Sequence, residues 1–353
     1  MKLKDKVCFL GFGCCGGKQA KEFLKMGYKA FAINGSEQDL KSLGDIPKYH
    51  LKGFDGFGGH RDRALECLAA NKDFMNFISN INEEIVFVLF GGGGSTGSGC
   101  GTLISEMLME EKDDDDKPIK IVCPIISLPS SDETSGKHSN AYLAVQELQD
   151  LDGLGATFFI NNDVSKDYSF INETFAKLLD TFLSNDAYSD KNNFDDAERV
   201  EMLKDDGAMV LSFTCRDNEQ SLMLDRLTRN GIFAPIETNK VCEHIGIIHA
   251  GNNDNDIDKK TVIAEVGKPS NDFQGYNNKK GTLIVVSGLS YPLTHVTKLG
   301  EMVLNAQKER QRNRKQTTQK LADLLIVEEE PAVNPKQTKK KPSKLDLLRR
   351  MTN

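Results

Sequence analysis

The stretch Phe87–Gly99, FVLFGGGGSTGSG, places six glycines among its last nine residues, directly after an apolar run. The apolar run predicts a buried strand, and a helix is expected from Gly101 onward. Glycine loses more conformational freedom on folding than any other residue, so six of them indicate a loop whose backbone must approach a ligand closely. Three hydroxyl side chains, those of Ser95, Thr96 and Ser98, stand beside the amide groups of this loop. The loop therefore predicts a phosphate cradle.

A second glycine loop, GFGCCGG at Gly11–Gly17, follows a strand and opens a helix. Its glycines fit the pattern G-x-G-x-x-G, which alone suits a Rossmann NAD(P)-dependent oxidoreductase, and that class stays as a distant alternative. Asn34 argues against the Rossmann class, because it ends the second strand, where such enzymes carry an acidic residue that binds the ribose. A Rossmann enzyme would also have no use for a second phosphate cradle. A Walker P-loop is not matched either, because Lys18 is followed by Gln19 instead of Ser or Thr.

Short apolar runs alternate with helical stretches through residues 1–163. The runs expected to form buried strands are Val7–Leu10, Ala30–Ile33, Ile85–Phe90, Ile119–Ile126 and Thr157–Ile160. The stretches expected to form helices are Lys18–Met26, Asp62–Ile78, Gly101–Glu110 and Ser139–Leu151. Strands that alternate with helices predict an α/β domain with a doubly wound, mainly parallel sheet.

A long amphipathic helix is expected next, because apolar side chains from Val164 to Phe182 step by threes and fours. This central helix and the polar loop after it fill residues 164–195. A second, smaller α/β domain is expected over 196–297, with strands at Ala208–Thr214, Cys242–Ala250, Thr261–Val266 and Thr282–Ser287. A charged C-terminal helix at 298–326 and a disordered basic tail at 327–353 complete the predicted chain.

The composition is typical of a globular protein that works in the cytoplasm. The 353 residues are 39% hydrophobic, which allows one large or two ordinary domains. The formal charge of −7 argues against strong direct DNA binding by the body. The eight cysteines contain no C-x-x-C pair and indicate reduced thiols. Neither a signal peptide nor an apolar run of the roughly 18 residues that span a membrane is expected.

The segment Gly93–Gly99, GGSTGSG, resembles the G-G-G-T-G-[ST]-G signature of the tubulin/FtsZ superfamily, with Ser95 as an extra or substituted residue. The resemblance extends over residues 5–300. It implies a tubulin/FtsZ-like fold with a GTP-binding domain at 1–163, a central helix and a second, activation domain. It also implies GTP and GDP as ligands of the glycine loops, together with Mg²⁺, for which no ligating residue is identified.

By the same resemblance, several loops would surround the phosphates. Gly11–Gln19 resembles the first phosphate loop, Ala32–Asn34 the second, and Gly56–Arg61 stands where the γ-phosphate loop belongs. Gly35–Glu37 departs from the T-D-A that follows the second loop in FtsZ. The residues implied to contact phosphates are Gly13, Cys14, Cys15, Gly16, Lys18, Gln19, Asn34, Gly58, Gly59, Gly93, Gly94, Ser95, Thr96, Gly97 and Ser98.

Two further segments resemble the family's ribose and base contacts. Pro129–Lys137 resembles the ribose loop P-x-x-x-E-x-x-x-[RK], which implicates Glu133 and Lys137. Ile160–Asp163 resembles the I-P-N-D turn and implicates Asn162 in guanine binding, with Asn172 on the central helix as a second contact. Asparagine suits guanine because its amide can both donate and accept hydrogen bonds.

The segment Asn193–Glu198, NFDDAE, resembles N-x-D-x-x-[DE], the loop that completes the active site of a neighbouring subunit in this superfamily. The resemblance implies that Asp195 and Glu198 orient the water that attacks the γ-phosphate of GTP. Two carboxylates three residues apart at a helix start lie on one face. The alternative is an Asp-rich helix cap with no catalytic part. Head-to-tail stacking is a heterologous contact that does not close, so it would generate filaments.

The divergent loops resemble the plasmid- and phage-borne bacterial tubulins of the TubZ family, including a clostridial phage form, more than an FtsZ division protein, which remains the alternative. This implies a GTPase filament that segregates plasmid or phage DNA, with a C-terminal tail that engages a DNA-binding adaptor of the TubR type on centromeric DNA. The segment from Lys336 to Asn353 contains seven basic residues and one acidic residue, Asp346. This excess of positive charge suits binding to DNA phosphate or to an acidic partner, or merely keeps the chain soluble. A scaffold that polymerises without hydrolysis is a further alternative, which the carboxylate loop opposes.

Overall fold

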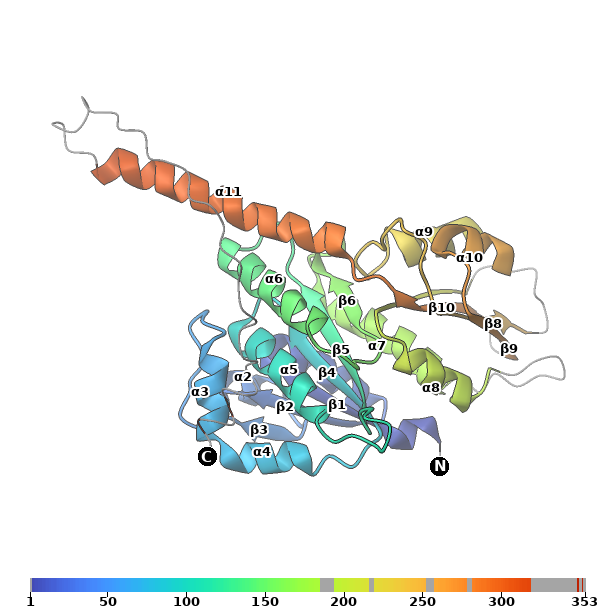
Figure 1. Cartoon of the computed structure of the whole chain (residues 1–353), viewed down its shortest axis with the longest axis horizontal. Coiled ribbons are helices and arrows are strands. Elements are labelled where there is room, and N and C mark those ends of the chain that lie inside the picture. The colour runs from blue at the N-terminus through green and yellow to red at the C-terminus, as the bar shows by residue number, and fades with distance from the viewer. Residues whose placement is uncertain are drawn as a thin grey trace.

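The computed structural model describes residues 2–184, 194–215, 219–251, 257–277 and 281–318, together with Leu348 and Met351. Figure 1 shows a larger part built on one sheet, a smaller part built on a second sheet, and a long helix, α11, that extends away from both. The predicted fold class is confirmed: a mainly parallel α/β unit, a central helix and a second, smaller α/β unit.

The larger part alternates strands and helices. In chain order its elements are η1 Leu3–Lys6, β1 Val7–Phe12, α1 Gly13–Lys25, β2 Lys29–Asn34, α2 Glu37–Ser42, β3 Lys48–His50, α3 Arg63–Ala70, α4 Lys72–Ser79, β4 Ile85–Gly91, α5 Ser95–Leu108, β5 Ile121–Leu128, α6 Ser135–Gln149, β6 Phe158–Asn161 and η2 Asn162–Val164. All five strands expected from apolar runs are present, and the short β3 is added to them.

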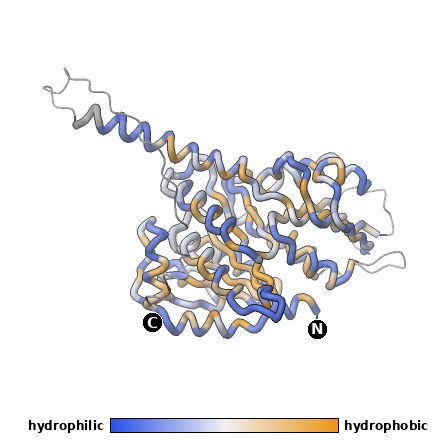
Figure 2. The backbone as a smooth tube through the Cα atoms, viewed as in Figure 1, coloured by the Kyte–Doolittle hydropathy of each residue, from blue (hydrophilic) through white to orange (hydrophobic). Residues whose placement is uncertain are grey.

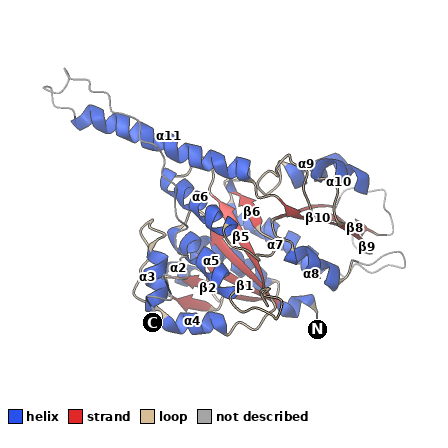
Figure 3. Ribbon diagram, in the orientation of Figure 1, coloured by secondary structure: helices blue, strands red, loops and turns tan. Residues whose placement is uncertain are grey.

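The six strands form one parallel sheet in the order β3-β2-β1-β4-β5-β6. Figure 3 shows the helices packed around it. Helices cover both faces of a parallel sheet, so its strands are buried on both sides and appear in the sequence as continuous apolar runs. Aromatic rings fill the centre: Phe9 of β1 stacks on Phe23 of α1 at 3.8 Å and on Phe87 of β4 at 4.8 Å between ring centroids. The strand order reverses direction between β1 and β4, which is where open α/β sheets bind ligands.

The rest of the described chain follows the sheet. Its elements are α7 Tyr168–Ser184, α8 Asp196–Lys204, β7 Ala208–Thr214, α9 Gln220–Thr228, β8 His244–Ala250, α10 Lys259–Val266, β9 Asn271–Asn277, β10 Thr282–Leu289 and α11 Leu293–Thr318. The second sheet has the order β7-β10-β8-β9. The strand expected at Thr261–Val266 is wrong, because this segment belongs to helix α10. Asp258 caps that helix by accepting a hydrogen bond from the Lys260 amide at 2.9 Å.

Helix α11 begins at Leu293 and not at 298, directly after Pro292, a residue that favours helix starts. Figure 2 shows its outer half to be mainly hydrophilic, whereas the strands of the large sheet are mostly hydrophobic. The predicted continuation to 326 and most of the predicted tail lie outside the described residues. Of the tail, Leu348 is buried against the core and Met351 is exposed. Within the described stretches, no helix is both long and apolar enough to cross a membrane.

Candidate nucleotide site at the carboxyl edge of the sheet

The loop after β1 turns directly into helix α1, which begins at Gly13 and has no side-chain cap. Gly13 has a φ of +72°, a backbone conformation that side chains other than glycine rarely adopt. A Cβ at this position would lie 3.1 Å from the backbone nitrogen of Gly97. The first glycine loop is therefore in backbone contact with the second.

The loop after β4 is built in the same way. Helix α5 begins at Ser95 after Gly94, again without a side-chain cap, so its first amides lack acceptors within the helix. A Cβ at Gly97 would meet the carbonyl oxygens of Phe12 and Gly91 at 3.1 and 3.2 Å. Because β1 and β4 are adjacent and in register, two uncapped helix starts meet at the point where the strand order reverses. Such a place suits phosphate, since helix amides and the positive end of the helix dipole both point there.

Side chains at the start of helix α1 tie the first glycine loop to strand β5. Gln19 is buried and its amide donates to the Ser127 hydroxyl at 2.9 Å, while its carbonyl oxygen has no partner among the described groups. Burial raises the pKa of the Cys15 thiol, which also hydrogen-bonds Ser127. Cys15 is therefore held as a neutral thiol and not as a reactive thiolate. Cys14 and Lys18 are exposed at the same helix start.

The loops after β2 and β3 flank the phosphate loops. Asn34 is buried at the end of β2, where its amide donates to Asp39 at 3.1 Å and its oxygen accepts from the Ser36 amide at 3.2 Å. Gly58 and Gly59 both have positive φ, +59° and +87°, in the loop before α3. An open hollow of about 560 Å³, within the size range of ligand sites, lies beside these loops and is bordered by Gly35 and Phe54.

The residues expected around the ribose and base come from the β5 and β6 ends. Glu133 forms an ion pair with Lys137 at the start of α6. The side chain of Lys137 faces Gly93, because a Cβ built on that glycine would lie 2.9 Å from the Cβ of Lys137. The loop after β5 is tied to the loop after β6 by Asp163, which accepts from the Ser131 amide at 2.7 Å and from its hydroxyl at 3.0 Å.

The two asparagines expected at the guanine lie on neighbouring elements. Asn162 is half-buried at the start of η2, and Asn172 is buried in α7. The predicted phosphate, ribose and base residues thus follow the carboxyl ends of all six strands of the larger sheet, with Asn172 in α7, the helix after β6.

The two expected catalytic carboxylates lie elsewhere, at the first turn of α8. Asp195 accepts hydrogen bonds from the amides of Ala197 at 2.9 Å and Glu198 at 3.1 Å, and Glu198 accepts from the Asp195 amide at 3.0 Å. This reciprocal arrangement is a capping box, so the helix cap expected as the alternative does form. These bonds use Oδ1 of Asp195 and Oε2 of Glu198. Burial, helped by the charge of Asp195, raises the pKa of Glu198.

The α8 turn is at the opposite edge of the sheet from the glycine loops. The amide of Leu3, in η1 just before β1, donates to Asp196 at 3.2 Å, which places α8 at the amino edge. Figure 1 shows α8 on the side of the N-terminus. The six residues of β1, at about 3.3 Å each, separate the two edges by roughly 20 Å. One chain therefore does not bring its carboxylates to its own phosphate cradle. Asn193 of the expected motif lies outside the described residues.

Three residues near the cradle were not assigned from the sequence. Arg61, at the end of the loop with Gly58 and Gly59, is buried and forms an ion pair with Glu147 of α6 at 2.6 Å. Asn140, also on α6, donates to the carbonyl oxygens of Gly59 and Gly93. Sequence signals could not reveal these partners, because Arg61 and Glu147 stand 86 positions apart. Arg61 ends the segment that resembles the γ-phosphate loop, whereas Glu147 belongs to no recognised motif.

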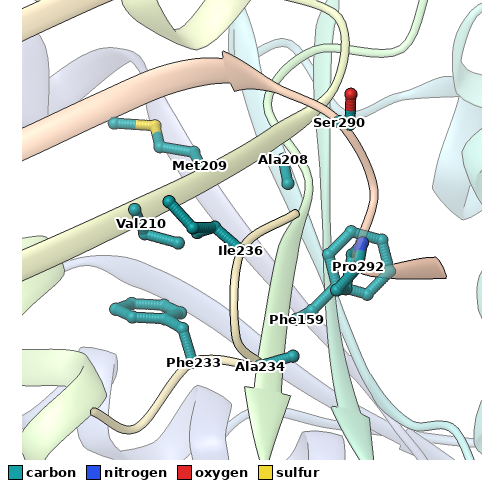
Figure 4. Close-up of a pocket in the computed structure, with 9 residues that line it drawn as sticks. All are labelled: Phe159, Ala208, Met209, Val210, Phe233, Ala234, Ile236, Ser290 and Pro292. Carbon is teal, nitrogen blue, oxygen red and sulfur yellow. The ribbon is translucent and has the colours of Figure 1, made fainter. Parts of the chain in front are cut away.

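A second hollow is apolar and much smaller. It has a volume of about 10 Å³ and lies between β6, β7 and the chain around Phe233, as Figure 4 shows. That is barely the space of one water molecule, so it does not compete as a nucleotide site. None of the eight cysteines, all in described stretches, forms a disulfide. The described part of the chain contains no cluster of three or more His, Cys, Asp or Glu side chains that could hold a metal.

Comparisons with known proteins agree with this fold. No family model matches the chain. The curated tubulin-like protein TubZ of Clostridium botulinum C phage is 26% identical over 337 residues, which cover 92% of this chain and 89% of the relative. The solved structure of tail-truncated TubZ from C. botulinum phage c-st matches with a TM-score of 0.74 at 26% identity, over 87% of this chain and 99% of that one. A GTPγS-form protofilament of Bacillus thuringiensis serovar israelensis TubZ matches with a TM-score of 0.73 at 16% identity, over 87% of this chain and 94% of that one, and supports the fold alone.

Proposed function

We propose that this chain, which is similar over 92% of its length to the tubulin-like protein TubZ of a Clostridium botulinum phage, binds GTP, assembles head to tail into filaments and hydrolyses GTP at the junction between subunits. One observation carries the proposal. The phosphate cradle and the α8 carboxylates occupy opposite edges of the same sheet. Stacking one subunit on the next brings the two half-sites together, and a contact between different surfaces propagates without closing.

We propose that the cradle binds a nucleoside triphosphate. The uncapped amides of α1 and α5 and the glycine backbones around Gly13 and Gly97 would hold the phosphates. Asn162 and Asn172 would contact guanine, and Glu133 with Lys137 would border the ribose. A protein of the same fold, TubZ of Bacillus thuringiensis serovar israelensis, has been solved as a GTPγS-form protofilament, so this fold can hold a guanine nucleotide.

Mg²⁺ is the metal that we propose to accompany GTP. It commonly keeps several waters and is held by substrate phosphates with one or two protein oxygens, so it requires no dedicated cluster of side chains. When bound, it would neutralise charge on the phosphate oxygens.

In the reaction, a water oxygen forms a bond to the γ-phosphorus while the bond to the β-phosphate oxygen breaks, so that GDP and inorganic phosphate are released. The proton lost by the water leaves with the phosphate or passes to solvent. We propose that Asp195 and Glu198 of the adjoining subunit accept hydrogen bonds from this water and orient it. The capping box assists, because it fixes one oxygen of each carboxylate and leaves the other directed away from these bonds. A helix cap and a catalytic pair are thus compatible.

The filament is proposed to segregate plasmid or phage DNA in the bacterial cytoplasm, through a DNA-binding adaptor of the TubR type that its basic tail engages. Removal of residues 336–353 should leave GTP-dependent assembly intact and weaken co-sedimentation with the adaptor–DNA complex at physiological salt. Undiminished capture by the truncated protein would place the recruiting surface on the body.

Sedimentation with GTP, GDP and GTPγS, with phosphate release followed in parallel, tests the main proposal. We expect pelleted polymer with GTP and GTPγS, little with GDP, and phosphate release only with GTP and only above the assembly concentration. Phosphate release that is linear in protein concentration without polymer would contradict a shared active site. Polymer without any hydrolysis would favour the scaffold alternative.

A further inference from the structure

One face of helix α6 reaches both loops that border the predicted terminal phosphate. Asn140 donates from its amide nitrogen to the carbonyl oxygen of Gly59 at 3.3 Å and to that of Gly93 at 3.2 Å. Glu147, seven residues later, lies two turns along the same face. It accepts from the Thr102 hydroxyl of α5 at 2.8 Å. Helix α6 thus fixes the position of the glycine loop before α3 relative to the signature loop before α5.

Arg61 fixes the end of the glycine loop to this face. Its Nη1 and Nη2 atoms each lie 2.6 Å from a carboxylate oxygen of Glu147. Nη2 also donates to the Ser98 carbonyl oxygen at 2.7 Å, and Nε to the Ser98 hydroxyl at 3.3 Å. The arginine is only 6% exposed. Glu147 is partly exposed, and the bidentate guanidinium–carboxylate pair favours one geometry because both of its bonds form only when the two planar groups face each other.

Between its glycines the same loop buries one side chain, that of Phe57. Gly56, Gly58 and Gly59 all have positive φ, and a Cβ on any of them would meet nothing within 4 Å. Glycine loops in open space sample many conformations. Close packing returns at Arg61, whose carbonyl oxygen would lie 2.4 Å from a Cβ on Gly99 of α5. The loop is therefore held at Phe57, which is buried in the core, and again at Gly59 and Arg61.

We propose that Arg61, Glu147 and Asn140 form a clamp that presets the Gly56–Arg61 loop for the terminal phosphate, and so determines the preference of this protein for GTP over GDP. The proposal rests on the proposed GTP binding. The three are positioning residues: they act through the loop backbone, by holding it in the bound conformation before the ligand arrives. GDP lacks the phosphate that the loop would meet, so releasing the clamp should weaken GTP binding and spare GDP binding.

The test uses the full chain and isothermal titration with GTPγS and with GDP. For Glu147→Gln we expect the GTPγS affinity to fall at least tenfold and the GDP affinity to change less than threefold. Arg61→Lys, which keeps one ion contact, should show an intermediate loss for GTPγS. Glu265→Gln is the matched control, because Glu265 forms a solvent-exposed pair with Arg229 at 3.1 Å and should leave both affinities unchanged.

Equal losses for GTPγS and GDP, or no loss for either, would overturn the clamp. Should Glu147→Gln fail to fold, Asn140→Ala carries the same comparison, with an expected threefold to tenfold loss for GTPγS alone. Wild-type protein that binds neither nucleotide would overturn the proposed function itself and the clamp with it. If the wild-type protein binds both nucleotides and the variants lose GTPγS and GDP affinity equally, the clamp is refuted while the proposed nucleotide binding stands.

Discussion

At Gly97 a single methyl group would press on the ends of two strands, β1 and β4. Its Cβ would lie 3.1 Å from the carbonyl oxygen of Phe12 and 3.3 Å from the amide nitrogen of Gly91, and neither backbone atom can rotate away. We expect Gly97→Ala to push the first phosphate loop away from the signature loop. GTPγS affinity should fall by at least about tenfold, which is about 1.4 kcal/mol, and titration calorimetry measures it.

Gly136→Ala provides the comparison for this substitution. A methyl group there meets nothing within 4 Å, near the start of α6. The change should leave nucleotide affinity unaltered and raise helix stability by up to about 1 kcal/mol. If both alanine variants bound GTPγS like the wild type, the assignment of the phosphate cradle would be wrong.

Glu198 has two roles in the structure, and a conservative substitution separates them. Glu198→Gln keeps an oxygen that can accept the hydrogen bond of the Asp195 amide and removes the negative charge. We therefore expect normal folding and GTP-dependent assembly, with hydrolysis slowed by ~10²-fold or more. Phosphate release per pelleted subunit is the measurement. Wild-type turnover in assembled Glu198→Gln protein would exclude a catalytic carboxylate at this position.

The pH dependence of hydrolysis follows from the same group. Burial raises the pKa of Glu198 above its ordinary value of 4.5. The proposed role needs the ionised carboxylate, so activity should be full well above the raised pKa and should fall as the pH drops through it. This loss should begin at a higher pH than an exposed glutamate would give. The residual hydrolysis of Glu198→Gln should lack that acidic limb if Glu198 is its cause.

Individual site residues differ in how far sequence alone could identify them. The glycines around Gly13 and Gly97 could be recognised, because only a backbone cradle explains so many of them. The ion pair of Arg61 with Glu147 could not, because it forms only when α6 folds across the sheet edge. The capping bonds of Asp195 and Glu198 were foreseen as an alternative to catalysis, whereas the structure shows that capping uses one oxygen of each.

At the level of elements, burial decided which predictions succeeded. The strands β1, β4 and β5 are covered on both faces and read as apolar runs. The strand β9, NDFQGYN, was missed because its first half is polar and exposed at the edge of the second sheet. The β-branched residues of helix α10 wrongly predict a strand, whereas the Asp258 cap starts a helix at this point.

The single helix expected at Asp62–Ile78 is in fact two, α3 and α4, which meet at Asn71. Its side chain accepts from the Lys52 amide at 2.8 Å and donates to the carbonyl oxygens of Lys52 at 3.1 Å and Cys67 at 2.7 Å. At roughly 1 kcal/mol for each bond, we expect Asn71→Ala to lower the free energy of unfolding by about 2–4 kcal/mol. Urea denaturation measures this loss.

Asn80→Ala is the matched control for the helix joint. Asn80 also donates to a carbonyl oxygen four residues earlier, that of Asn76 at 2.7 Å, but it is exposed. Its replacement should change stability by less than about 0.5 kcal/mol. Similar losses in the two variants would show that Asn71 is an ordinary helix end and does not hold the joint.

For the whole molecule, the proposed function requires that each subunit carry two incomplete halves of one active site. The proposed nucleotide half lies at the carboxyl ends of the six strands, and the proposed acidic half lies at the amino edge, where η1 meets α8. The resemblance of Asn193–Glu198 to the superfamily's loop implied that the two halves meet across subunits, whereas the order of the motifs along the chain does not give the sheet edge at which each one lies. The parallel direction of every strand in the larger sheet makes the separation unavoidable within one subunit.

A mixing experiment tests this sharing directly. Glu198→Gln subunits should bind GTP and lack the carboxylate. Gly97→Ala subunits keep the carboxylate and, at a GTP concentration below their weakened dissociation constant, should carry little GTP. Each alone should release little phosphate. Mixed filaments, identified by co-sedimentation of differently labelled subunits, should recover hydrolysis wherever the intact α8 of one variant meets the GTP of the other. Replacing the second partner by a Gly97→Ala, Glu198→Gln double variant should abolish the recovery. If filaments that contain both single variants remain inactive, Glu198 does not act across the junction, because every such filament presents a bound GTP to an intact carboxylate.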